Sequence, residues 1–91
     1  MKILATFNSP GMTSDQYDNV INELEKAGLG SPDGRISHVC GINEESLFVT
    51  DVWESEEKFA KFGESLMPIL ESIAVNVSPP KIIPFYNSLG G

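Results

Sequence analysis

The order of strand-like and helix-like segments most constrains the fold of this chain. Two runs rich in Ile, Val and Phe are separated by a short polar connection and predict a β-hairpin, Arg35–Ile42 and Leu47–Trp53. An amphipathic segment with helical spacing precedes this hairpin and another follows it. A strand-like run lies near each end of the sequence, Lys2–Asn8 and Lys81–Asn87. The order β-α-β-β-α-β is typical of a ferredoxin-like α+β domain, with a four-stranded antiparallel sheet and two helices on one face.

Local signals set the ends of both predicted helices. Thr13–Gln16 has the spacing of a capping box, and apolar residues follow at helical spacing: Tyr17, Val20, Ile21 and Leu24. Ser55 is placed as the N-cap of the second helix, whose apolar stripe is Phe59, Phe62, Leu66, Ile69 and Ile73. Because proline has no amide proton, we expect a kink or a split near Leu66–Pro68. Residues Ala74–Pro80 are expected to be extended, and Pro84 predicts an edge position or an interrupted ladder for the last strand.

The charge balance excludes two classes of partner. Six Lys+Arg and thirteen Asp+Glu give a net charge of −7 for the 91 residues, which we expect to form a single domain, 1–91. Nucleic acids and anionic membranes both need a basic face, so we expect neither as a partner. No apolar run reaches the ~18 residues of a membrane span, and the start is too short and too polar for a signal peptide. We therefore expect a cytoplasmic protein.

Apolar residues occupy both faces of the predicted sheet. In the strand Leu47–Trp53, one face carries Leu47, Val49 and Trp53. The other face carries Phe48 and Val52. A single layer of two helices covers one face only, and an apolar face left in water marks an interface. We therefore expect a homodimer in which two sheets pack face to face.

The chain resembles the dimeric α+β barrel superfamily, which includes the antibiotic-biosynthesis-type monooxygenases and the heme-degrading monooxygenases. The resemblance rests on the element order, the start of the first strand, and the strand-to-helix junction Asp51–Ser55 followed by Phe59 and Phe62. It implies a dimeric α/β barrel. The superfamily hosts several activities as well as members without one, so the resemblance bears on fold more than on function.

Two sets of site residues follow from this resemblance. Heme-degrading members use an Asn late in the first strand, a Trp near the end of the third strand, and a His on the second helix. Asn8 and Trp53 lie near the first two positions, but the segment Ser55–Ile73 contains no His, so we expect neither heme nor another cofactor. Cofactor-free members are said to place Asn, Trp, Tyr and Arg around an aromatic substrate. Residues of these types here are Asn8, Trp53, Tyr86 and Arg35.

His38, the only histidine, marks the candidate site. Alternation places it on the same face as Ile36 and Cys40. A two-residue hairpin loop pairs His38 with Val49, whereas a four-residue loop, residues 43–46, pairs it with Asp51. Either register puts His38, Asp51 and Trp53 on one surface. A carboxylate beside an imidazole fixes its tautomer and prepares a general base, although an ordinary buried structural pair has the same pattern.

We place the candidate site between the helices and the sheet. His38 and Asp51 are its catalytic candidates, and its ligand-binding candidates are Trp53, Tyr17, Phe62 and Asn8. No metal is expected, since the chain has one His and one Cys, Cys40, which we assign to the strand core; a lone cysteine forms no internal disulfide. The favoured function is binding of a small aromatic or hydrophobic molecule. The alternative is a cofactor-independent monooxygenase or related enzyme that acts on a small aromatic or polyketide-like compound. In that enzyme His38 takes a proton from an acidic substrate hydroxyl, Asp51 holds the imidazole and balances its charge, and Trp53 stacks on the ring.

Overall fold

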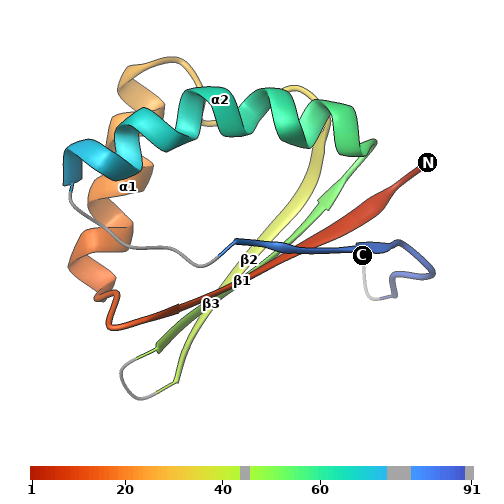
Figure 1. The fold of residues 1–91 in the computed structure, drawn as a ribbon, viewed down its shortest axis with the longest axis horizontal. Helices are drawn as coiled ribbons and strands as arrows, with labels where there is room; N and C mark the ends of the chain where they lie inside the picture. Colours follow the sequence, from red (N-terminus) through yellow and green to blue (C-terminus); the bar gives the residue numbers. More distant parts are fainter. Residues whose placement is uncertain (44–45, 74–78, 90–91) are drawn as a thin grey trace.

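The computed structural model describes residues 1–43, 46–73 and 79–89, and its elements follow the expected order (Figure 1). They are β1 (Ile3–Pro10), α1 (Ser14–Lys26), β2 (Arg35–Asn43), β3 (Ser46–Trp53), α2 (Glu56–Ile73) and β4 (Lys81–Pro84). The strands pair antiparallel in the order β2-β3-β1-β4, so β1 and β3 are central and β2 and β4 are edges. Both helices lie on the same side of the sheet (Figure 1). The fold is therefore the predicted ferredoxin-like α+β fold.

Side-chain caps begin both helices, as the sequence predicts. The Thr13 hydroxyl accepts a bond from the backbone N–H of Gln16, and the Gln16 side chain accepts one from the backbone N–H of Thr13. The Ser55 hydroxyl accepts a bond from the backbone N–H of Lys58, which caps α2. These bonds satisfy amide groups that have no partner within their own helix. Neither of the two described helices is long and apolar enough to cross a membrane.

Prolines shape the C-terminal third differently from the prediction. α2 runs unbroken from Glu56 to Ile73, so of the kink or split expected near Leu66–Pro68 the split does not occur. Pro68 has no amide hydrogen, so the Glu64 carbonyl lacks its helical partner. Both residues are exposed, which leaves that carbonyl on the water side. β4 ends at Pro84 rather than Asn87, and it is followed by a backbone bond from Phe85 N–H to the Lys2 carbonyl. Of the segment expected to be extended, residues 74–78 lie outside the described residues.

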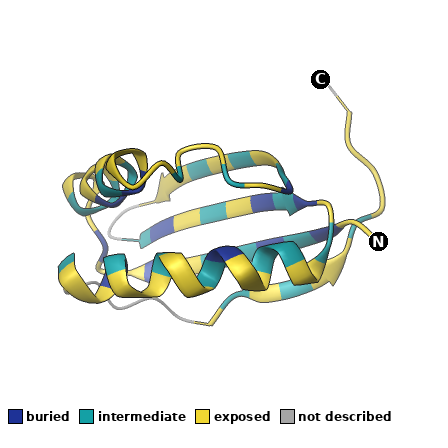
Figure 2. Ribbon diagram, turned by 90° about the horizontal axis from the view of Figure 1, so that it is seen from above, coloured by how far each residue is buried: buried dark blue, intermediate teal, exposed yellow. Residues whose placement is uncertain are grey.

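The core lies between the helices and the inner face of the sheet, which we define as the face toward α1 and α2. Buried and exposed residues alternate along the strands (Figure 2), as expected for a sheet covered on one side. Trp53 is fully buried, with its ring centroid 5.5 Å from that of Phe59 and 5.3 Å from that of Phe62. The other buried core residues are Ile3, Ala5, Met12, Val20, Leu24, Leu47 and Leu70.

The opposite, outer face of the sheet is apolar as well, which confirms the expectation of two apolar faces. Val39, Phe48 and Ile83 are exposed there by 65%, 41% and 36%, and Leu4 and Val52 pair across the central strands beside them. No described helix covers this face (Figure 1). It is the exposed apolar surface that the sequence pattern requires.

Candidate functional site

A chain of hydrogen bonds joins four side chains on the inner face. The hairpin adopts the register that pairs His38 with Asp51. Its strand pairing continues beyond Ile42, the expected end of the strand, to Asn43 opposite Ser46. His38 Nδ1 lies 2.5 Å from Asp51 Oδ1, and His38 Nε2 lies 2.6 Å from the hydroxyl of Tyr17 on α1. Trp53 Nε1–H donates to Asp51 Oδ2 over 3.4 Å. Residues from α1, β2 and β3 therefore form one connected polar chain inside the fold.

Burial acts on two ionisable side chains at this site, Tyr17 in the hydrogen-bonded chain and Cys40 beside it. Asp51 is only 4% exposed, yet both of its oxygens are bonded, and no buried side-chain polar atom lacks a partner in the described part of the protein. Burial raises the pKa of Tyr17 to about 12, and the nearby Cys40 and Asp51 act in the same direction. Burial also raises the pKa of the Cys40 thiol. Tyr17 and Cys40 are therefore uncharged at neutral pH.

A cavity of about 80 Å³ lies beside these hydrogen-bonded side chains, between the helices and the sheet. Its apolar wall includes residues from both helices and from β1 and β3: Phe7, Val20, Leu24, Val49, Phe62 and Leu70. Its polar lining is Ser9, Tyr17, Arg35, His38 and Asp51. A larger, open groove of about 550 Å³ between α1 and β2 is also lined by Tyr17, Arg35 and His38. These three side chains therefore stand where the apolar cavity meets the groove, which we call the mouth.

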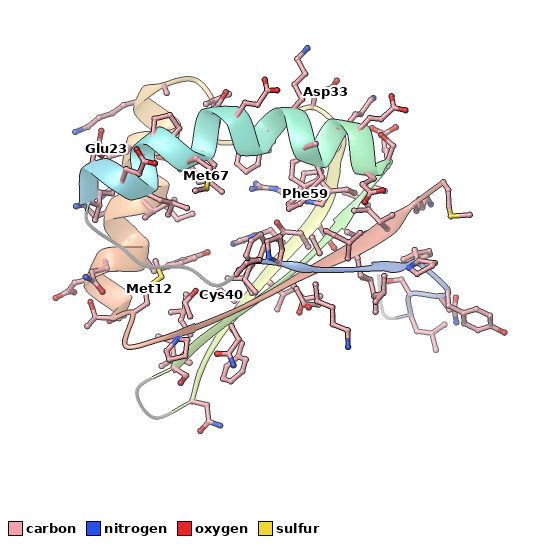
Figure 3. All side chains as sticks on the ribbon, viewed as in Figure 1. Met12, Glu23, Asp33, Cys40, Phe59 and Met67 are labelled. Carbon is pink, nitrogen blue, oxygen red and sulfur yellow. The ribbon has the colours of Figure 1, made fainter. Side chains whose placement is uncertain are left out.

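Two aromatic residues of α2, Phe59 and Phe62, line the cavity from the helix side. Phe59 points from α2 toward the sheet (Figure 3), where its ring centroid lies 6.0 Å from that of Phe7. Phe62 lines the cavity from the same helix, and Tyr17 lines it from α1. The structure thus places Phe62 and Tyr17 at the cavity, where the sequence predicts them.

A β-bulge brings Arg35 to the mouth. The register shifts between Arg35 and Ser37, so Arg35 lies opposite Trp53 while Ile36 is the extra residue and is 50% exposed. Ile36 therefore lies outside the regular alternation from which its face was predicted. A turn precedes the bulge, with Gly34 at φ +93° and the Arg35 N–H donating to the Pro32 carbonyl over 3.2 Å. The Pro-Asp-Gly sequence was the available signal for this irregular entry into the strand.

Three other candidate residues lie away from the cavity. Trp53 is fully buried, donates a hydrogen bond to Asp51 and is not in the cavity lining. Asn8 is exposed, because its neighbours Phe7 and Ser9 both line the cavity and alternation turns Asn8 to the outer face. Tyr86 is 96% exposed beyond the end of β4. The aromatic and amide groups that the resemblance implies are thus not gathered at this cavity.

The remaining predicted residues are placed as follows. His38 lies at the mouth, where its two ring nitrogens are bonded to Asp51 and Tyr17. Cys40 lies opposite Val49, half-buried and packed against the core. Ser9, 2% exposed, is a polar cavity residue that the sequence analysis missed. In the described ranges no group of three His, Cys, Asp or Glu side chains is placed to hold a metal ion.

Comparisons with known proteins identify the fold. No family model matches this sequence, and no curated protein does so either. Among solved structures, a candidate antibiotic biosynthesis monooxygenase from Chloroflexus aurantiacus J-10-fl superposes with a TM-score of 0.70 at 17% identity, over 99% of this chain and 98% of that one. SnoaB, a cofactor-independent oxygenase from Streptomyces nogalater, superposes with a TM-score of 0.68 at 11% identity, over 99% and 97%.

A third solved structure with this fold is described as dimeric. A dimeric ferredoxin-like protein from an uncultured marine organism superposes with a TM-score of 0.56 at 14% identity, over 96% of this chain and 93% of that one. The superpositions establish the fold, and identities this low carry no site residue across. The chain has the ferredoxin-like fold of the antibiotic biosynthesis monooxygenase-type proteins.

Proposed function

We propose that this protein binds a small aromatic or hydrophobic molecule in the cavity between the helices and the sheet. The observation that carries this proposal is an apolar cavity whose polar groups converge at one mouth, at Tyr17, Arg35 and His38. Pockets for drug-sized ligands measure roughly 300–1,000 Å³. The cavity of about 80 Å³ therefore accepts one ring or a short chain, and the rest of a larger ligand extends into the groove.

The same cavity is the place where the alternative function would operate. SnoaB is described as a cofactor-independent oxygenase, and a monooxygenase of Streptomyces coelicolor with a TM-score of 0.58 was solved in complex with the ligand nanaomycin D. Those descriptions concern those proteins. In this chain the Tyr17–His38–Asp51 bonds would have to carry a substrate proton, and no separate observation favours that step over binding. Binding is therefore the function that the geometry supports best.

We propose further that the protein is a homodimer through the outer face of its sheet. Val39, Phe48 and Ile83 expose apolar area on this face, and one structure with the same fold is described as dimeric. Exposed contiguous apolar area is a feature of surfaces that meet a partner. A second copy presenting the same surface satisfies both sheets at once.

A matched pair of substitutions tests the binding proposal. Wild-type protein is titrated with small phenols and anthrones, and binding is followed by NMR shifts of cavity residues. Leu66→Trp adds an indole to the cavity lining and should weaken binding at least tenfold, because it occupies the space the ligand needs. Leu89→Trp makes the same change at a position that is 88% exposed and should leave binding unchanged. Equal affinities in the two variants would place the ligand elsewhere.

Oxygen consumption separates binding from catalysis. We expect the same compounds to bind without oxygen uptake above that of a buffer control. Uptake that depends on wild-type protein and is lost in His38→Ala would instead establish the monooxygenase alternative. The readout is an oxygen electrode, with His38→Ala first shown to be folded by circular dichroism.

A further inference from the structure

We propose that Tyr17 makes the cavity selective for ligands that donate a hydrogen bond, such as a phenol or an amine, over ligands that can only accept one. This inference rests on the proposed binding function and names the ligand chemistry of the same site. It follows from the direction of the hydrogen bonds between Trp53, Asp51, His38 and Tyr17.

The direction is set at the buried end of the chain. An indole N–H can only donate, and a carboxylate can only accept. Trp53 Nε1–H therefore donates to Asp51 Oδ2, and His38 Nδ1 must carry a hydrogen to donate to Asp51 Oδ1. A neutral imidazole with its hydrogen on Nδ1 has a lone pair on Nε2. The buried carboxylate thus decides the tautomer of His38.

That tautomer commits the hydroxyl hydrogen of Tyr17. The Tyr17 oxygen lies 2.6 Å from His38 Nε2, so its O–H donates to that nitrogen. Burial keeps the Tyr17 phenol protonated at neutral pH. Its oxygen therefore has only lone pairs left for a ligand in the cavity, and a ligand must bring the hydrogen.

The other polar groups at the cavity do not replace this acceptor. The Arg35 guanidinium only donates, and one of its nitrogens, Nη2, already donates to the Gly30 carbonyl over 2.9 Å. Both Asp51 oxygens are bonded within the chain, and the residue is 4% exposed. Ser9 is 2% exposed. Tyr17 is thus an acceptor in the cavity lining that a ligand entering from the groove also meets.

A pair of matched ligands tests the selectivity. The dissociation constants of para-cresol and of its methyl ether, 4-methylanisole, are measured by NMR titration of wild-type protein, Tyr17→Phe and Tyr86→Phe. One hydrogen bond favours the cresol by about three- to tenfold in wild-type protein. Tyr17→Phe should bring the ratio of the two affinities close to one. Tyr86→Phe removes the other tyrosine hydroxyl, at a residue 96% exposed, and should keep the wild-type ratio.

The outcomes separate the two proposals. Equal binding of both compounds to wild-type protein, or a ratio that survives in Tyr17→Phe, overturns the selectivity and leaves cavity binding standing. If neither compound nor any of the phenols and anthrones binds, both proposals fail.

The tautomer of His38 gives a second test that needs no ligand and no variant. The ¹⁵N shifts of the His38 ring in wild-type protein at neutral pH should show a hydrogen on Nδ1 and a lone pair on Nε2. A hydrogen on Nε2 would reverse the bond to Tyr17 and overturn the inference.

Discussion

The two faces of the sheet depart from the usual distribution of polar and apolar residues in opposite ways. The inner face buries polar side chains, with Asp51 at 4% and Ser9 at 2% exposure. The outer face exposes large apolar ones, with Val39 at 65% and Phe48 at 41%. Buried polar groups and exposed apolar groups are the informative exceptions to the rule that apolar residues lie inside. The inner exception indicates a site, and the outer exception indicates a partner.

The covering helices account for the difference between the faces. On the inner face, α1 supplies Tyr17 to complete the hydrogen bonds of His38, so a buried polar chain has no unmet group. On the outer face no described helix covers the sheet, and Phe48 is 41% exposed. The inner face is covered by helices and the outer face is not covered by any described helix. Substitutions on the two faces should therefore have different consequences.

The largest expected effect is on the inner face. Asp51→Ala leaves the indole N–H of Trp53 and Nδ1 of His38 without an acceptor in a buried position. We expect a loss of about 3 kcal/mol in the free energy of unfolding, measured by urea denaturation. Asp33→Ala, at a side chain that is 87% exposed, is the control and should change it little. A similar loss in both variants would mean that the polar chain does not stabilise the fold.

The second prediction concerns the outer face. Phe48→Lys places a charge in the centre of the proposed dimer interface and should raise the dimer dissociation constant at least tenfold, measured by sedimentation velocity over a concentration series. Met67→Lys makes the same kind of change at a 50% exposed residue of α2 and should leave dimerisation unchanged. Wild-type protein that stays monomeric at every concentration would refute the dimer.

The smallest expected effect appears in alkaline solution. The pKa of Tyr17 is raised from 10.0 to about 12 in the folded protein, so the folded state holds a proton that the unfolded state has lost between these values. Stability from this group is therefore complete below pH 10 and falls as the pH rises toward 12. Unfolding free energies of wild-type protein and Tyr17→Phe from pH 9 to 11.5 should diverge in slope, with the steeper decline in wild-type protein. Parallel curves would show that Tyr17 titrates as it does in the unfolded chain.

Local signals in the sequence determined the elements and their faces. The capping residues Thr13 and Ser55 fixed the starts of both helices, because their hydroxyls act within one turn of the chain. Alternation placed Phe48 and Val49 on opposite faces for the same local reason. The cytoplasmic location and the absence of a cofactor stay predictions.

The tertiary structure decided which partners the candidate site residues have. Hairpin register chose Asp51 over Val49 as the partner of His38, and the bulge at Ile36 turned Arg35 to the mouth. Local alternation does not choose between the two registers, because both keep His38 and Asp51 on one face. It also does not reveal a bulge, whose extra residue moves the side chains before it to the other face. Helix packing then decided that Tyr17, and not a ligand, occupies Nε2 of His38. The residue types came from the sequence, but their partners depended on contacts between segments far apart along the chain.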